Sequence, residues 1–122
     1  MRLENEIRVE RYGDVIILDI RGDITSYSET ALKASYHKHV EQQDRKIILK
    51  IERDAYINSG GIALLIQVLY LIRENRQIAA IVGASRHYKK IFNMVGITKF
   101  AKICDTLEIA LDTSDSKPGP NP

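Results

Sequence analysis

Short runs of β-branched and other apolar residues alternate in this chain with longer segments whose apolar residues recur at helical spacing. The runs cover residues 15–20, 47–51 and 77–82, and each contains at most one charged residue. A run of this kind is typical of a strand that is buried on both faces, as in parallel sheets. Because strands that alternate with helices join through right-handed crossovers, this order predicts an α/β fold with a mostly parallel sheet.

The segments around these strands complete the predicted domain. Residues 7–11 alternate like a half-buried strand and precede a turn, so we expect an opening hairpin. Ser26 and Glu29 form a capping-box pattern before the first helix. The remaining predicted elements are helices over 32–40, 61–76 and 88–95, a short strand at 102–104 and a final helical turn or two at 106–111. The sequence therefore predicts a sheet of four to five strands packed by about four helices.

The size and composition of the chain fit one globular domain. Its 122 residues are 44% hydrophobic and 28% charged, and we expect the domain over residues 1–113 and a disordered tail over 114–122. The net charge of +2 is too small to indicate nucleic-acid binding. No stretch approaches the roughly 20 apolar residues of a membrane span. With one cysteine, Cys104, and no signal peptide, the sequence predicts a cytoplasmic protein.

The segment Asn58-Ser59-Gly60-Gly61 lies where a buried strand gives way to a strongly apolar helix. Backbone N–H groups at a helix N-terminus lack acceptors within the helix, and the macrodipole there favours negative charge. A phosphate on Ser59 would therefore change the local electrostatics sharply, whereas an unmodified serine there is an ordinary helix cap. Tyr56 is expected in the core. Because sites in parallel sheets lie beyond the carboxyl ends of strands, residues 22–25 and 83–85 are expected on the same edge.

Patterns of catalytic and metal-binding residues are missing from the sequence. A catalytic serine needs a base and an orienting group, but no carboxylate is placed to orient His87 on the Ser59 edge. There is no paired cysteine, no His-Glu-x-x-His and no acidic calcium loop. Residues 58–61 also lack the lysine and the glycine spacing of a phosphate-binding P-loop. We therefore expect no catalytic residue, no metal site and no cofactor.

Three segments carry a resemblance to a known family. Residues 47–65 run from a hydrophobic strand through Asn58-Ser59-Gly60-Gly61 into an apolar helix, residues 81–97 form a strand and a helix ending in Gly-Ile, and residues 15–24 form a strand ending in Gly-Asp-Ile. In this order and spacing they resemble the STAS domain of bacterial anti-sigma factor antagonists and of sulphate transporters. The match covers all of the chain except the tail. A stand-alone chain of this length resembles the antagonists.

The resemblance implies a phosphorylation switch. In the antagonists, a cognate anti-sigma factor with serine kinase activity phosphorylates a serine, and a PP2C-type phosphatase removes the phosphate. The unphosphorylated form binds the anti-sigma factor and thereby frees the sigma factor. Carried over onto this chain, the phosphoacceptor is Ser59, and the resemblance implies a partner-binding surface formed by Asp23, Thr25, Asn58, Ser59, Gly60 and Gly61.

The chain departs from the family pattern within this motif. Asn58 stands where the family has Asp, and Gly60 stands where it has a second Ser. Asn keeps the size and the capping capacity of Asp but carries no charge. If the acid only shapes the turn, Asn58 serves equally well; if it helps to recruit the kinase, phosphorylation is slower or absent. The alternative function is a STAS adaptor or a transport-system subunit that is not phosphorylated.

Overall fold

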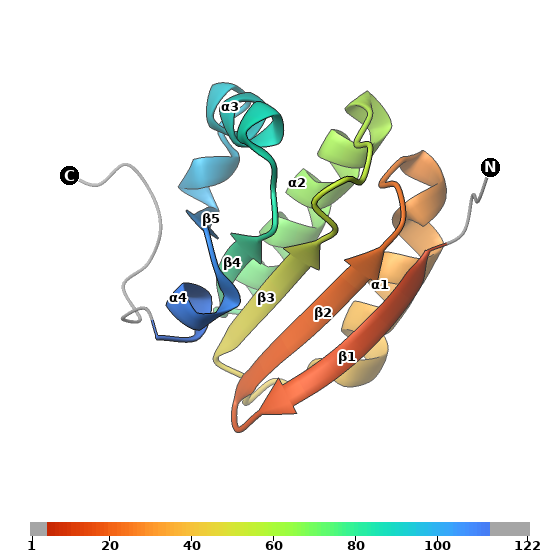
Figure 1. Ribbon diagram of the computed structural model, residues 1–122. Coiled ribbons are helices and arrows are strands. Elements are labelled where there is room, and N and C mark those ends of the chain that lie inside the picture. The colour runs from red at the N-terminus through yellow and green to blue at the C-terminus, as the bar shows by residue number, and fades with distance from the viewer. Residues whose placement is uncertain (1–4, 113–122) are drawn as a thin grey trace.

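A computed structural model of the chain describes residues 5–112, and these residues form a five-stranded sheet. The strands lie across the sheet in the order β1-β2-β3-β4-β5, with one antiparallel pair followed by parallel pairs (Figure 1). Their bounds are β1 Glu6–Tyr12, β2 Val15–Arg21, β3 Lys46–Ile51, β4 Ile78–Val82 and β5 Ala101–Cys104. The predicted α/β fold with its opening hairpin is confirmed.

Helices cover both faces of this sheet. The described residues form α1 Glu29–His39, α2 Ser59–Glu74, α3 Arg86–Met94 and α4 Leu107–Asp112, with 3-10 helices η1 Ser26–Ser28 and η2 Ile97–Lys99. α1 and α2 pack on one face, and α4 packs on the other (Figure 1). The predicted set of about four helices is confirmed. The predicted end of the domain at residue 113 and the predicted tail lie outside the described residues.

The start of α1 differs from the predicted capping box. The sequence pattern indicated Ser26 and Glu29, but the members of the box are Thr25 and Ser28, one residue earlier. Thr25 Oγ1 accepts a hydrogen bond from the Tyr27 N–H at 3.1 Å, and Ser28 Oγ accepts one from the Thr25 N–H at 3.0 Å. The difference arises because the chain first makes the 3-10 turn η1, whose free N–H groups come before those of α1.

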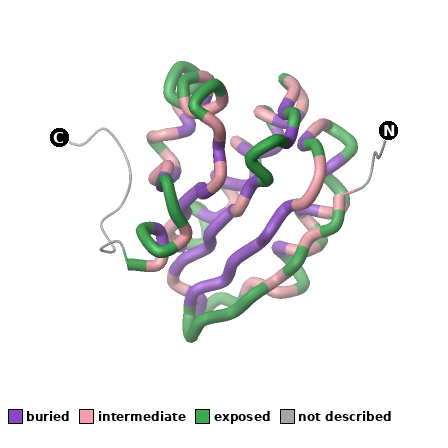
Figure 2. The backbone as a smooth tube through the Cα atoms, in the orientation of Figure 1, coloured by how far each residue is buried: buried purple, intermediate pink, exposed green. Residues whose placement is uncertain are grey.

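Both faces of the central strands are covered, which accounts for their continuous apolar runs. On one face, Leu18, Leu49 and Ile81 join buried side chains of α1, α2 and α3 in the main cluster. On the other face, Ile48 and Val82 belong to a smaller cluster with α4. Figure 2 shows that β2, β3 and β4 are mostly buried, whereas the edge strand β1 is mostly exposed. Fully burying one such side chain stabilises the fold by roughly 1.5–3 kcal/mol, so these clusters hold the strand ends in position.

An ion pair ties the opening hairpin to the loop before β3. Arg11 Nη1 lies 2.6 Å from Asp44 Oδ1, and the Glu41 N–H donates to Asp44 Oδ2 at 2.7 Å. Burial of the covered Asp44 carboxylate acts to raise its pKa, but the Arg11 guanidinium and the Glu41 N–H outweigh burial, so the pKa is lowered. The charged form of Asp44 therefore stabilises the folded protein as long as Arg11 is present.

Candidate functional site

The loops that follow β2 and β3 lie side by side at the carboxyl end of the sheet. A parallel bridge pairs Ile24 with Ile57 beyond the ends of the two strands. The Ile24 N–H donates to the Tyr56 carbonyl at 2.9 Å, and the Asn58 N–H donates to the Ile24 carbonyl at 3.3 Å. The predicted convergence of these two loops is confirmed, and the start of α2 lies directly beside them.

Asn58 caps α2, and Ser59 is the first residue of this helix. Asn58 Oδ1 accepts a hydrogen bond from the Gly61 N–H at 2.8 Å. Ser59 is exposed, and within residues 5–112 its hydroxyl makes no hydrogen bond. The N–H groups of Ser59 and Gly60 also have no acceptor in that part of the chain. The interpretation of Ser59 as the helix cap is therefore wrong, and its hydroxyl lies free at the positive end of a 16-residue helix.

Both glycines of the motif lie against the loop after β2, and Gly61 has no room for a side chain. A Cβ atom on Gly61 would lie 2.0 Å from the carbonyl oxygen of Ile24, a distance that only a shift of the backbone could relieve. A Cβ atom on Gly60 would lie 3.1 Å from the backbone nitrogen of Ser26. The structure shows that they admit the loop after β2 against the first turn of α2.

Asp23 and Thr25 hold the same loops through their side chains. Asp23 Oδ1 accepts a hydrogen bond from the Tyr56 N–H at 2.9 Å. Thr25 caps η1, the short helix that begins beside Gly60. The structure thus brings all six predicted site residues together at one edge, with four of them engaged in holding the edge: Asp23, Thr25, Asn58 and Gly61.

Two exposed tyrosines on the same loops were not assigned to the site from the sequence. Tyr27 of η1 is 67% exposed and Tyr56 is 59% exposed. The prediction that Tyr56 lies in the core is wrong, because Ala55 and Ile57 on either side of it are buried and the extended segment turns alternate residues outward. That alternation is visible in the sequence and could have identified Tyr56. Exposed tyrosines are common anchors in protein interfaces.

Tyr88 connects α3 to the loop before Ser59. Its hydroxyl oxygen accepts a hydrogen bond from the Ile57 N–H at 2.8 Å. α3 is capped by Ser85, whose Oγ accepts from the Tyr88 N–H at 3.2 Å, so residues 83–85 and α3 reach the same edge as predicted. Sequence periodicity placed Tyr88 on the apolar face of a helix. No local pattern indicates that its hydroxyl binds a backbone 31 residues away.

A site built on His87 and a site built on a metal ion are the other possibilities in the described part of the chain. His87 is exposed, and its ring contacts the Tyr88 ring with centroids 5.0 Å apart. Among residues 5–112 no group of three or more His, Cys, Asp or Glu side chains is arranged to hold a metal ion. None of the helices described there is long and apolar enough to span a bilayer.

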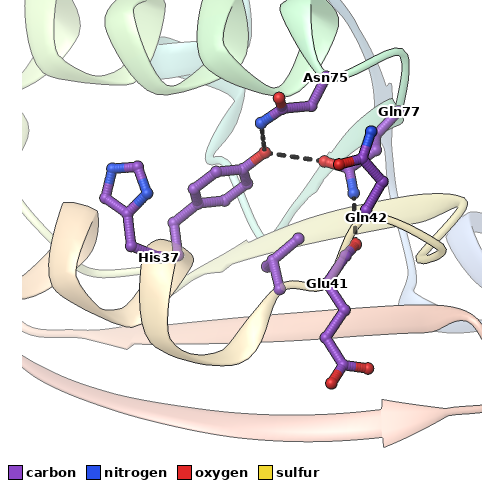
Figure 3. A pocket seen from close by; sticks show the side chains of 7 residues that line it. His37, Glu41, Gln42, Asn75 and Gln77 are labelled. Atoms are coloured by element: carbon purple, nitrogen blue, oxygen red, sulfur yellow. Dashed lines mark hydrogen bonds between the residues drawn. The ribbon is translucent and has the colours of Figure 1, made fainter.

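A small cavity of about 140 Å³ lies at the opposite end of the sheet, where the parallel strands begin. Tyr36 Oη donates to Gln77 Oε1 at 2.8 Å and accepts a hydrogen bond from Asn75 Nδ2 at 2.7 Å (Figure 3). Gln77 Nε2 donates to the Glu41 carbonyl at 2.9 Å. These polar groups of the wall are bonded to one another and tie the ends of α1 and α2 to the sheet. These polar groups therefore have a structural role, and the candidate site remains at the Ser59 edge.

Comparisons with known proteins agree on the fold. A sequence model of the STAS domain matches residues 6–110. The chain is 19% identical over 105 residues to BtrV of Bordetella bronchiseptica, a candidate anti-sigma factor antagonist, with 86% of this chain and 90% of the relative covered.

Two solved structures resemble this one at the level of the fold. One is the crystal structure of a candidate anti-sigma factor antagonist from Thermotoga maritima, with a TM-score of 0.74, 18% identity, and coverage of 87% of this chain and 92% of that chain. The other is an NMR structure of the protein TM1081, with a TM-score of 0.71, 18% identity, and coverage of 85% and 84%.

Proposed function

This chain belongs to the STAS domain family, and from that premise we propose that it is a cytoplasmic anti-sigma factor antagonist switched by phosphorylation of Ser59. In the proposed cycle, the unphosphorylated chain binds an anti-sigma factor with serine kinase activity and so frees a sigma factor. Phosphorylation of Ser59 releases the chain, and a PP2C-type phosphatase restores it. The chain acts by binding and performs no catalysis of its own. The observation that carries the switch is the exposed hydroxyl of Ser59 at the first position of α2, which makes no hydrogen bond to any of residues 5–112.

The domain can accept a phosphate at this position without losing its fold. Phosphorylation adds about −1.5 to −2 charges and three acceptor oxygens. Within residues 5–112 the Ser59 hydroxyl makes no hydrogen bond, so its esterification breaks none there. The N–H groups of Ser59 and Gly60 lie next to the new group, and the helix macrodipole contributes about 0.3–1 kcal/mol in its favour. The modification is therefore expected to change the surface rather than the fold.

A bound partner would respond much more strongly than the domain itself. A protein surface that covers Ser59 would have to take the phosphate out of water, and an unpaired buried charge costs several kcal/mol. Each 1.4 kcal/mol lost from the interface weakens binding tenfold. Exposed Tyr27 and Tyr56 on the adjacent loops supply aromatic area for such a partner. The same edge thus combines a contact surface with a residue whose charge can be changed.

The structure supports a role for Asn58 that does not need the family's acid. Its side-chain oxygen caps α2 through the Gly61 N–H, a bond that an Asp carboxylate would make in the same way. We therefore propose that Asn58 keeps the loop in the phosphorylatable shape and that the missing charge does not prevent the switch. An Asn58→Asp variant is the direct control, because it restores the family's acid and keeps the cap.

The test is phosphorylation of the full chain by anti-sigma kinases from the same genome. The chain is incubated with each purified kinase and Mg-ATP, and intact mass reports whether one phosphoryl group is added. We expect addition to wild type and to Ser26→Ala, an exposed serine on the neighbouring loop, but not to Ser59→Ala. We also expect calorimetry to show tight binding of the kinase by the unphosphorylated chain only. No modification by any of the kinases, or equal binding of both forms, would instead favour the unphosphorylated adaptor or transport-system subunit.

A further inference from the structure

The charges of this chain are distributed unevenly along its second half. Between Glu74 and Asp105 there is no acidic residue, whereas the same segment contains six Lys or Arg residues. These are Arg76, Arg86, Lys89, Lys90, Lys99 and Lys102. Three of the six lie on α3, the helix that Tyr88 fastens to the loop before Ser59. α3 therefore carries three of these cations and is itself joined to the edge of the sheet on which Ser59 lies.

The exposed side of α3 carries two of these cations in one stripe. Arg86, Lys90 and Met94 are four residues apart, so they lie on the same side of the helix, and all three are exposed. Met94 is 81% exposed, and it adds an apolar side chain to the end of this stripe. Lys89 pairs with Asp105, but Arg86 and Lys90 have no ion pair within residues 5–112.

This arrangement does not favour the helix itself. The first turn of α3 has no acidic residue and contains Arg86, although the macrodipole favours acids at that end. Arg86 and Lys90 are like charges at i and i+4, a spacing at which they repel each other. Local rules of stability tend to be broken where a residue serves a function outside the fold. The stripe is therefore better explained by something that binds to it than by the stability of α3.

We propose that the stripe of Arg86, Lys90 and Met94 docks an acidic protein surface, in which carboxylates surround an apolar side chain. This proposal rests on the proposed function, because the docked protein is the partner that also covers Ser59. Opposite charges across the interface fix its orientation and speed its association. Because the partner surface is acidic, a phosphate on Ser59 repels it. The cations of the stripe and the unphosphorylated state of Ser59 therefore both favour binding of this partner. Two unpaired cations on a short helix are too few for a lipid surface, which is typically bound through four to eight.

The main experiment compares two exposed helical lysines of equal charge. Lys90→Glu changes a residue of the stripe. Lys38→Glu changes a residue of α1, a helix on the far side of the sheet from α4 and away from α3. Binding of the anti-sigma factor to each full-length variant is measured by calorimetry at low and at physiological salt. We expect Lys90→Glu to weaken binding about tenfold and to reduce the salt dependence, and Lys38→Glu to change it less than twofold. Equal effects of both variants would overturn the proposal.

A second experiment does not depend on the anti-sigma factor. A synthetic peptide of alternating glutamate and leucine is added to the isotope-labelled full chain, and NMR shift changes are mapped. Changes centred on Arg86, Lys90 and Met94 support the docking face even if no anti-sigma kinase binds, in which case only the proposed function fails. Changes spread over all exposed lysines, Lys38 included, refute it. Binding of wild type but not Lys90→Glu to phosphatidylglycerol vesicles, without binding of the peptide, would assign the stripe to lipid and overturn the protein partner.

Discussion

The Asn58→Ala variant tests whether the cap of α2 holds the candidate site in shape. In the structure, Asn58 Oδ1 lies 2.8 Å from the Gly61 nitrogen, and alanine leaves that N–H without this acceptor. Replacing an N-cap Asn by Ala costs about 0.5–2 kcal/mol, typically near 1. Asn58 is half-buried, so water can reach part of the vacated position. We therefore expect a loss in the middle of this range, about 1 kcal/mol.

The companion variant Asn58→Asp keeps an acceptor oxygen and adds a negative charge at the positive end of α2. This charge contributes about 0.3–1 kcal/mol in favour of the fold, so stability at neutral pH is expected to equal or exceed that of wild type.

Urea unfolding followed by circular dichroism measures both changes, and the slope of the transition should stay constant because the fold is unchanged. For a domain of this size, 1 kcal/mol corresponds to a shift of about 4 °C in the thermal midpoint. The reasoning is refuted if Asn58→Ala is as stable as wild type, or if Asn58→Asp is as unstable as Asn58→Ala.

The other predictions concern the glycine contact, the buried ion pair and the phosphoacceptor. Gly61→Ala places a Cβ atom against the Ile24 carbonyl and should cost about 1–3 kcal/mol in urea unfolding; an unchanged midpoint would contradict the close approach. Folding lowers the pKa of Asp44, so the charged carboxylate contributes its full stabilisation of the fold above the ordinary pKa near 3.8. This contribution is lost as the pH falls toward the lower pKa that Asp44 has in the folded protein. Asp44→Asn should flatten the acid side of the stability curve, and Arg11→Met should lower the free energy of unfolding at neutral pH; an acid limb that stays as steep would exclude this pair as its source. Ser59→Asp should weaken partner binding at least tenfold and leave the free energy of unfolding within about 0.5 kcal/mol of wild type; an unfolded variant would show that Ser59 has a structural role.

Local sequence pattern was sufficient to predict the architecture and the edge of the sheet at which the candidate site residues meet. Helices cover both faces of the sheet, so the residues of β3 and β4 that face either side are apolar. Each strand therefore appears in the sequence as a nearly continuous apolar run. The polar, glycine-rich segment after β3 predicts the start of α2, because a helix commonly begins where a side chain can accept a hydrogen bond from the N–H groups of its first turn. The parallel order then brings the strand-end loops to one edge without any knowledge of side-chain contacts.

What the sequence determined by itself was therefore the order of the elements, the edge at which the candidate site lies, and the position of Ser59 on that edge. The sequence also predicted that Asn58 is the cap, and the structure confirms it. Only the tertiary structure decided that Gly61 must be small because Ile24 lies against it, and that Tyr88 fastens α3 to the site. The order of the elements, the edge and the position of Ser59 could be predicted because hydrophobic periodicity depends only on residues that are neighbours along the chain. The contacts of Gly61 with Ile24 and of Tyr88 with Ile57 join segments separated in sequence, and they depend on distances that exist only after the chain has folded.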